Sequence, residues 1–306
     1  MLDTVIIGSG PAGLAAAIYA SRAALNYVVL EKAGYSGGQI VTTNDLDNYP
    51  GMPNIDGASF SMALQEHAEK LGAEIKEATV TAIKQNEDNS YTVEIEGQEP
   101  PILTKSVVLA TGANPRTLNV PGEQQYLSRG VYYCATCDGA FYRNKTTAVI
   151  GGGNTALEDV LFLAKICEKV YLIHRRDELR GDKHSQEKIF AMPNVEFVKS
   201  ALPKSIKGDK KVSAIEIEYK KTGEIVDIPV DGIFVAVGMI PNNQLVPDFV
   251  NTDDAGYVIA DETGKTNAKG FFVAGDLRTK DLRQVLTAAS DGANAIKSVT
   301  DYLNEI

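Results

Sequence analysis

Short apolar runs, each flanked by glycine or polar residues, divide this chain of 306 residues into alternating strands and helices. Thr4–Ile7 and Ser106–Gly112 each contain a run of successive apolar residues, which is typical of buried strands. Leu14–Ala24 is rich in alanine and predicts a helix, and Tyr27–Leu30 predicts the strand that follows it. This strand, helix, strand order is typical of the α/β class.

The same order of elements returns in the second half of the chain. Thr147–Ile150 predicts a strand, and a helix is expected from about Leu157 to Cys167. Ile215–Tyr219 alternates between apolar and polar residues, and Asp231–Gly238 repeats the strand-to-glycine pattern of Ser106–Gly112. The two halves therefore share one element order.

The segments between these strands have their own signals. Ser59–Leu71 predicts a helix, with its first residue as a possible N-cap. Alternation in Val80–Ile83 and Tyr91–Ile95 predicts a small antiparallel sheet. Two loops rich in turn residues, Gly34–Gln39 and Asp47–Gly51, are expected to return the chain over a bound ligand.

A late strand and helix indicate that one domain is inserted into another. Gly270–Asp276 is a third strand ending in glycine, and a helix follows from about Gln284 to Ala295. Both come after the second half is complete, so we expect linkers that permit a hinge at Ala113–Leu118 and Ile240–Pro247. The predicted fold is α/β, with two Rossmann-like nucleotide-binding domains of three-layer ββα architecture, the second (residues 116–245) inserted into the first (residues 1–115 and 246–306).

Composition narrows the function. Hydrophobic residues make up 44% and charged residues 23% of the chain, which is typical of a soluble globular protein. The formal net charge of −10 argues against a nucleic-acid partner and against an anionic membrane surface. No apolar run is long enough to span a bilayer and no signal peptide is evident, so we expect a cytoplasmic protein. Three cysteines in that reducing compartment favour metal binding or redox chemistry over a structural disulfide framework.

The turn after the first strand has the G-x-G-x-x-G signature of dinucleotide binding. In this signature the glycines permit a tight turn, close approach of the backbone to a pyrophosphate, and close packing of helix on strand. Glu31 ends the next strand, where an acid accepts hydrogen bonds from an adenosine ribose. A glycine-rich turn without a ligand is the alternative, but the complete context favours FAD or NAD, and later motifs favour FAD. The residues of the turn are Gly8, Ser9, Gly10, Pro11, Ala12 and Gly13.

A second glycine turn lies 143 residues further along the chain, which indicates an internal duplication. At the same offset from Glu31 the second half has His174, which is followed by Arg175 and Arg176, with Arg180 a turn later. Guanidinium groups bind a 2′-phosphate that an acid would repel, so this site favours NADP(H) over NAD(H). A solvated basic cluster is the alternative. The predicted contacts in the turn are Gly151, Gly153, Asn154, Thr155 and Ala156.

Between the two turns stand Cys134 and Cys137, separated by two residues and followed at once by Asp138. Two sulfurs at this spacing can form a disulfide, which opens again when it receives two electrons. A neighbouring acid can donate and accept the proton that accompanies this change. A tetrahedral zinc site would need a second cysteine or histidine pair, which the sequence lacks. Cys167 is expected to be a buried core residue.

At these motifs the chain resembles the low-molecular-weight thioredoxin reductases, a branch of the pyridine nucleotide-disulfide oxidoreductase family. The resemblance spans essentially the full length, and the cysteine motif inside the second domain is its most specific part. The glutathione-reductase branch instead places its cysteine pair just after the first nucleotide unit, where this chain has none. Many members carry histidine at the position of Met239. The shared motifs are both glycine turns, Gly37–Gln39, Cys134–Gly139, His174–Arg176, Gly275–Asp276 and Arg283–Gln284.

The resemblance implies an oxidoreductase with FAD in the first domain and NADPH in the second, acting as a homodimer on thioredoxin or a thioredoxin-like protein. It places flavin contacts at Glu31, Gly38, Gln39, Asn48, Asp276, Arg283 and Gln284. The rest of the predicted cofactor-binding set in the first domain, next to these contacts, is Gly37, Thr111, Gly112, Gly275 and Val285.

The resemblance also implies the electron path. NADPH passes hydride to the flavin, and the reduced flavin opens the disulfide, with Cys137 nearer the isoalloxazine. Cys134 then attacks the thioredoxin disulfide, and Asp138 is the general acid and base. In this family the inserted domain rotates between two states. Two alternatives stay open: a related enzyme that uses ferredoxin as donor or oxygen as acceptor, and a flavin-binding module whose cysteines only sense redox state.

Overall fold

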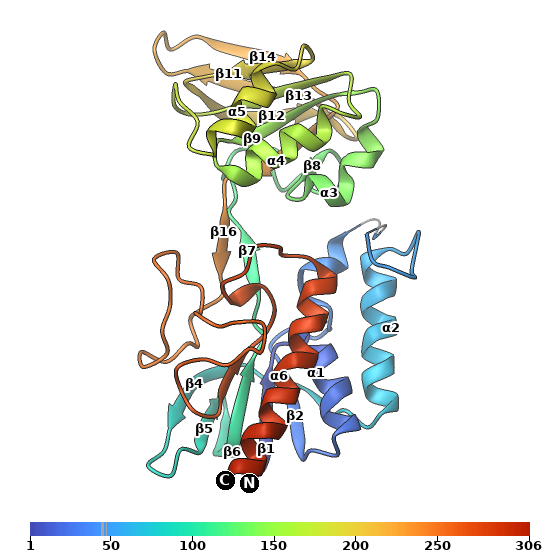
Figure 1. The fold of residues 1–306 in the computed structure, drawn as a ribbon. Coiled ribbons are helices and arrows are strands. Elements are labelled where there is room, and N and C mark those ends of the chain that lie inside the picture. The colour runs from blue at the N-terminus through green and yellow to red at the C-terminus, as the bar shows by residue number, and fades with distance from the viewer. Residues whose placement is uncertain (44–45, 47) are drawn as a thin grey trace. The chain divides into compact units, whose positions relative to one another are not determined.

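The computed structural model describes residues 1–306 except Asn44, Asp45 and Asp47, and it divides into two compact units. The first unit combines Met1–Thr42, Tyr49–Asn114 and Ile240–Ile306, and the second is built on the continuous segment Pro115–Met239. Each unit has a central sheet covered by helices on one face and by further strands on the other (Figure 1). The predicted α/β class and the inserted second unit are therefore confirmed.

The first unit is built on a sheet in which five strands run parallel. One line of aligned residues crosses it, because Ile6 pairs with Val29 and Val108, and these pair in turn with Ile75 and Phe272. These residues face the helices, which explains why the runs are apolar without interruption. The strands are β1 (Leu2–Ile7), β2 (Tyr27–Glu31), β3 (Ile75–Glu77), β6 (Gln98–Leu109) and β17 (Phe271–Val273).

Helices and a hairpin cover the two faces of this sheet. Helix α6 packs directly on α1, since a Cβ at Gly292 would lie 2.1 Å from the Ala12 carbonyl oxygen. The opposite face is covered by the antiparallel strands β4 (Val80–Gln85) and β5 (Tyr91–Ile95), which pair with each other as predicted. The helices are α1 (Pro11–Arg22), α2 (Gly57–Lys70) and α6 (Val285–Glu305), with 3₁₀ turns η1 (Gly38–Thr42) and η3 (Gly275–Leu277).

The second unit repeats this plan. Its line of aligned residues runs from Tyr132 through Phe234, Val149 and Leu172 to Phe197. Val149 and Leu172 lie 143 residues after Ile6 and Val29, so the duplication seen in the glycine turns extends to the register of the sheet. The parallel strands are β8 (Val131–Tyr132), β9 (Thr146–Gly151), β10 (Lys169–Ile173), β11 (Val195–Val198) and β15 (Gly232–Ala236).

Helices cover one face of this second sheet and an antiparallel sheet covers the other. Cys167 is buried among the helix-side residues, as predicted. The helices are α3 (Ala135–Asp138), η2 (Gly139–Tyr142), α4 (Asn154–Leu163) and α5 (Lys183–Phe190), and the antiparallel strands are β12 (Ala201–Gly208), β13 (Val212–Tyr219) and β14 (Ile225–Pro229). Among the described residues, no helix has both the length and the apolar character needed to cross a bilayer.

Several element ends differ from the predictions. Helix α2 begins at Gly57 because Asp56, and not Ser59, is the N-cap: the Asp56 carboxylate accepts hydrogen bonds from the Ser59 N–H at 2.8 Å and hydroxyl at 2.6 Å. Helix α4 begins at Asn154, directly after the glycine turn, and ends at Leu163. Helix α6 runs beyond the predicted end to Glu305, because small and apolar residues continue along its buried face.

Two short strands, β7 (Ala113–Pro115) and β16 (Met239–Pro241), pair with each other where the chain passes between the units. The division after Met239 lies six residues before the predicted boundary. The reason is that Asn242 belongs to the first unit: its N–H donates to the Gly112 carbonyl at 2.9 Å, and its side chain donates to the Thr111 carbonyl at 2.8 Å.

Candidate active site

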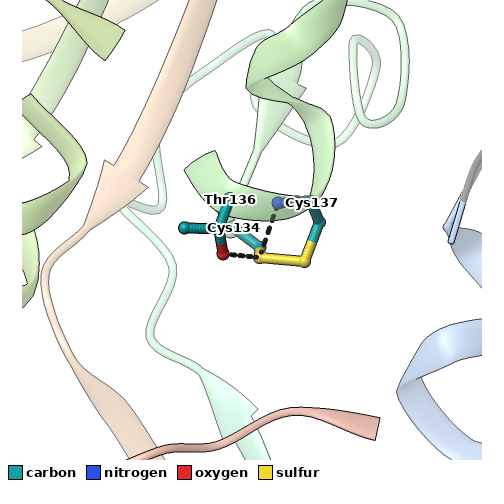
Figure 2. Close-up of a disulfide and its surroundings, with 3 residues drawn as sticks. All are labelled: Cys134, Thr136 and Cys137. Atoms are coloured by element: carbon teal, nitrogen blue, oxygen red, sulfur yellow. Dashed lines mark hydrogen bonds between the residues drawn. A yellow bond between two sulfur atoms is a disulfide. The ribbon is translucent and has the colours of Figure 1, made fainter. Parts of the chain in front are cut away.

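Cys134 and Cys137 form a disulfide at the start of α3, with their Cα atoms 5.3 Å apart. Cys134 is the N-cap of this short helix, and its sulfur accepts a hydrogen bond from the Cys137 N–H at 3.2 Å. The Thr136 hydroxyl lies 3.4 Å from the same sulfur (Figure 2). Both cysteines are partly exposed, so the pair is accessible for thiol–disulfide exchange.

Asp138 is buried at the end of α3, beside a cluster of aromatic rings. The rings of Tyr132, Tyr142 and Phe234 lie 5.6–5.7 Å apart, between β8, η2 and β15. Burial raises the pKa of the Tyr132 and Tyr142 phenols, and the nearby charge of Asp138 adds to this effect. Asp138 is thus a buried acid directly after Cys137 in the chain, and a carboxyl group can act as a proton donor and acceptor.

A second buried acid, Asp159 on α4, was not predicted. Burial and the neighbouring charge of Glu158 raise the pKa of Asp159 to about 7, and a hydrogen bond from the Ala135 backbone N–H opposes this rise. Asp159 therefore ties α4 to the residue that follows Cys134. A signal for it exists in the sequence, because Asp159 falls on the face of α4 that otherwise carries the buried Ala156, Val160 and Leu163.

The second glycine turn closes over His174. A Cβ on Gly152 would lie 2.5 Å from the imidazole ring, so only glycine fits there. His174 is buried, and its Nε2 has no hydrogen-bond partner among the described residues. Burial lowers the pKa of this imidazole, and the charges of Arg180, Arg175 and Arg176 lower it further.

The three arginines near His174 are exposed, and none forms an ion pair with a described residue. They are Arg175, Arg176 and Arg180. The nearest acid in sequence, Asp177, is instead held by Lys221 at 2.7 Å and by the Ser200 hydroxyl at 2.7 Å. The Arg180 N–H donates to the Gly152 carbonyl at 2.6 Å, which brings this residue beside the glycine turn. Gly153, Asn154, Thr155 and Ala156 open α4 at the same place. The cluster can therefore bind an anion next to a helix N-terminus.

In the first unit, the other glycine turn is held by Glu31. Its carboxylate accepts hydrogen bonds from the Ser9 N–H at 2.7 Å, the Ser9 hydroxyl at 2.8 Å and the Ala33 N–H at 3.0 Å. A Cβ on Gly13 would lie 1.8 Å from the Gly8 carbonyl oxygen, whereas a Cβ on Gly10 would have no neighbour closer than 4.0 Å. Gly8 and Gly13 allow the strand and the helix to pack closely. Gly10 leaves the backbone of the turn accessible to a ligand.

Two further predicted segments lie against this turn. The Gly37 N–H donates to the Ser9 carbonyl at 2.9 Å, and a Cβ on Gly275 would lie 2.9 Å from that of Ala12. Pro11 is the first residue of α1, Gly38 opens η1, and Gln39 donates to the Ala113 carbonyl. Thr111 and Gly112 follow the end of β6, and Asn48 is exposed in the turn before Tyr49. Asp47, the first residue of the predicted second loop, lies outside the described residues.

Asp276 and Arg283 are the strongest indication in this unit of a site for a polar ligand. Asp276 Oδ1 and Arg283 Nε are buried and have no hydrogen-bond partner among the described residues. Burial raises the pKa of Asp276 although Lys280 and Arg283 oppose it. The Arg283 guanidinium also stacks on Tyr257, with its central carbon 4.1 Å from the ring centroid. A ligand with both hydroxyl groups and acceptor atoms would satisfy these two side chains.

Gln284 and Val285 form the start of α6. Gln284 is the N-cap, and its N–H donates to the Thr287 hydroxyl at 3.1 Å in a capping box. Asp291, on the buried face of this helix, was not predicted. Its carboxylate accepts from the Gly275 N–H at 3.0 Å and from buried Arg278 and Lys280. A charged residue on the apolar face of a helix was the available signal, since such a charge needs partners.

Comparisons with known proteins agree with this geometry. The family model described as pyridine nucleotide-disulphide oxidoreductase matches residues 2–292. A thioredoxin reductase of Peptoclostridium acidaminophilum is 42% identical, over 98% of this chain and 96% of its own. The chain belongs to the pyridine nucleotide-disulphide oxidoreductase family. The predicted resemblance is confirmed.

Solved structures of related oxidoreductases match over the full chain. The crystal structure of thioredoxin reductase from Streptococcus pyogenes MGAS5005 has a TM-score of 0.93 at 42% identity and covers 100% of this chain and 99% of that chain. A ferredoxin-flavin thioredoxin reductase from Clostridium acetobutylicum has a TM-score of 0.54 at 28% identity and covers 100% and 99%. For this oxidoreductase, family membership implies a flavin and a nicotinamide cofactor, and the two sites described above have the polar groups to hold them. No set of metal-ligating side chains occurs among the described residues.

Proposed function

We propose that this oxidoreductase is a thioredoxin-disulfide reductase, which takes electrons from NADPH by way of FAD and delivers them to thioredoxin or a thioredoxin-like protein. The Cys134–Cys137 disulfide carries this proposal, because it is an accessible redox pair in a chain that matches thioredoxin reductases over nearly its whole length. We further propose that the protein works as a homodimer, as the family resemblance implies.

In this proposal the first unit holds FAD. Glu31, kept in place by Ser9, accepts hydrogen bonds from the ribose, and the open face of Gly10 leaves room for the pyrophosphate. Asp276 and Arg283 pair their unsatisfied atoms with polar groups of the ligand. When bound, FAD supplies a carrier that accepts a hydride and passes electrons on in pairs to a disulfide.

The second unit holds NADPH. Exposed Arg175, Arg176 and Arg180 bind the 2′-phosphate, since their charges are not neutralised by described acids. His174 Nε2 lies beneath the glycine turn, where it can bind the nucleotide or an ordered water. An acid in place of these cations would favour NADH instead.

The cysteine pair carries out the exchange with the substrate. On receiving two electrons, the Cys134–Cys137 bond opens to a thiol and a thiolate. Cys134 attacks a sulfur of the thioredoxin disulfide, and Cys137 then displaces the reduced substrate and restores the intramolecular bond. Asp138 donates a proton to the leaving thiolate and recovers one from the Cys137 thiol when that thiol displaces the substrate.

Anaerobic titration of the flavin-loaded protein tests the proposal. NADPH is expected to bleach the flavin absorbance and to make Cys134 and Cys137 available to an alkylating reagent, and NADH serves as the matched control with weaker binding. Added thioredoxin should then be reduced in proportion to the NADPH consumed. A flavin that stays oxidised in excess NADPH would refute the proposed electron donor.

A second candidate uses ferredoxin as donor, which is the donor named for the Clostridium acetobutylicum relative. The unpaired arginines and the complete second glycine turn favour NADPH. Turnover with reduced ferredoxin against NADPH separates the two. The redox-sensor alternative is tested by Cys134→Ser, which should abolish thioredoxin reduction and leave electron transfer from NADPH to the flavin intact.

A further inference from the structure

The two sulfurs of the disulfide have different surroundings. Cys134 Sγ accepts the Cys137 N–H at 3.2 Å and lies 3.4 Å from Thr136 Oγ1. A disulfide sulfur has no hydrogen to give, so the Thr136 hydroxyl is the donor (Figure 2). The described residues give no hydrogen bond to Cys137 Sγ. The asymmetry is already present before the bond opens.

We propose that Thr136 is a catalytic residue for disulfide exchange: its hydroxyl donates to the Cys134 sulfur, stabilises the thiolate formed there, and so selects Cys134 over Cys137 as the attacking sulfur. This inference rests on the proposed function for its substrate. A hydrogen bond to the charged form of an acid favours that form, and a thiolate is a stronger acceptor than a disulfide sulfur.

The position of Thr136 supports this role over a packing role. Its side chain is exposed, whereas Ala135 before it is fully buried and Cys137 after it is half-buried. An exposed threonine in the middle of a four-residue helix contributes no core contact. Its hydroxyl is instead directed at the reacting sulfur, and the other donor to that sulfur is a backbone N–H that no substitution removes.

Thr136 assists the exchange between the Cys134 thiolate and the substrate disulfide. The Cys134 thiolate attacks one sulfur of the substrate disulfide, a new sulfur–sulfur bond forms between Cys134 and the substrate, and the second substrate sulfur leaves as a thiolate that takes a proton from Asp138. The Cys137 thiol gives its proton to the Asp138 carboxylate and attacks Cys134 Sγ, which releases the first substrate sulfur as a thiolate that is protonated by water. The dithiol of the enzyme is oxidised by two electrons, and the substrate disulfide is reduced by the same two.

The test is the pH dependence of Cys134 alkylation in the holoenzyme, after reduction with dithiothreitol and removal of the reductant. Iodoacetamide labelling at each cysteine is quantified by mass spectrometry. Thr136→Val keeps the branched shape and removes the hydroxyl, and Thr136→Ser is the matched control that keeps the hydroxyl. Buried Cys167 is the internal reference, since burial raises the pKa of its thiol and it lies outside the pair.

The valine variant should raise the apparent pKa of Cys134 by about 0.5 to 1 unit, and so slow its alkylation below that pKa by roughly three- to tenfold. The serine variant should titrate like the wild type. Titratable groups near α3 include Tyr133 directly before Cys134, Asp138 on α3, Glu158 and Asp159 on α4, and the phenols of Tyr132 on β8 and Tyr142 on η2. All of them are the same in both variants, so their contribution cancels in the comparison.

Equal titration of Cys134 in the wild type and the valine variant would overturn the inference, and so would an equal shift in the valine and serine variants. Thr136→Ala is the second variant if valine prevents folding, with circular dichroism as the check. If wild-type protein fails to reduce thioredoxin, the proposed function fails, but the alkylation result still decides the role of Thr136. If thioredoxin is reduced, the valine variant should lower kcat/KM for thioredoxin several-fold and leave flavin reduction by NADPH unchanged.

Discussion

Asp291 on α6 and Arg278 after η3 form a bidentate ion pair in the interior of the first unit. Arg278 Nε lies 2.9 Å from Asp291 Oδ2, and Arg278 Nη2 lies 2.7 Å from Asp291 Oδ1. Their side chains are only 2–3% exposed. Lys280 joins the same carboxylate at 2.9 Å, and the Gly275 N–H completes the set at 3.0 Å. Asp291 thereby anchors the turn that carries Asp276, a proposed flavin contact.

Asp291→Ala should lower the free energy of unfolding by about 3–5 kcal/mol, because it leaves two buried cations without their carboxylate. It should also weaken FAD binding, since the Gly275 turn loses its anchor. Glu262→Gln is the control: Glu262 contacts Arg278 at 3.0 Å but is 82% exposed, so its loss should cost less than about 1 kcal/mol. Urea unfolding of both variants measures the difference, and equal costs would contradict the assignment.

The two glycines that flank the start of α1 should behave differently when a methyl group is added. Gly13→Ala places a Cβ 1.8 Å from the Gly8 carbonyl oxygen and should destabilise the first unit by about 1–3 kcal/mol or more. Gly10→Ala meets no protein atom closer than 4.0 Å and should leave the melting temperature of the flavin-free protein unchanged. It should weaken FAD binding by about tenfold, equivalent to about 1.4 kcal/mol. Flavin fluorescence titration measures this, and unchanged affinity would argue against a pyrophosphate at Gly10.

Asp159 should make stability depend on pH in a definite direction. Its pKa is raised from the ordinary value of 3.8 to about 7 in the folded protein. Below about pH 4 both folded and unfolded forms are protonated; as pH rises towards 7 only the unfolded form ionises, so the contribution of Asp159 to stability falls and then levels off. Asp159→Asn removes this dependence and keeps an acceptor for the Ala135 N–H.

The asparagine variant should therefore gain stability relative to wild type between about pH 4 and 7, by an amount on the order of a few kcal/mol at the upper end. Chemical denaturation across this range measures the difference. Asp159→Ala is the companion variant, which also loses the contact with Ala135. Parallel stability curves for wild type and Asp159→Asn would show that the carboxylate is not buried as the structure has it.

Replacing Arg175 and Arg176 together by alanine should change the choice of nicotinamide nucleotide. The KM for NADPH should rise by about 10- to 100-fold, since each charge-assisted bond to a 2′-phosphate is worth about 1.5–3 kcal/mol and exposure to water reduces this value. The KM for NADH should change little. Steady-state kinetics with both nucleotides measure the ratio. A parallel loss with NADH would mean that the arginines support the fold of the second unit and not the phosphate.

The local motifs of this protein were readable from the chain because each is formed by neighbouring residues. The two glycine turns, the acid at Glu31 and the arginines after His174 lie within single strand, turn and helix units, where spacing alone determines which side chains meet. The offset of 143 residues between Gly8 and Gly151 extends to the sheet register, because a duplicated sequence repeats the same apolar pattern. The cysteine pair is local as well.

The tertiary structure decided what depends on segments far apart in the chain. Periodicity places Asp291 and Asp159 on buried helix faces, but only packing shows that one binds Arg278 and Lys280 and the other the N–H of Ala135. Likewise His174 occupies a nucleotide-site position in the sequence, and only the fold puts its ring under Gly152. The partner of a buried charge or ring is the group that the packed elements bring within hydrogen-bonding or contact distance. That partner is distant in sequence, so the residues next to the charge or ring do not reveal it.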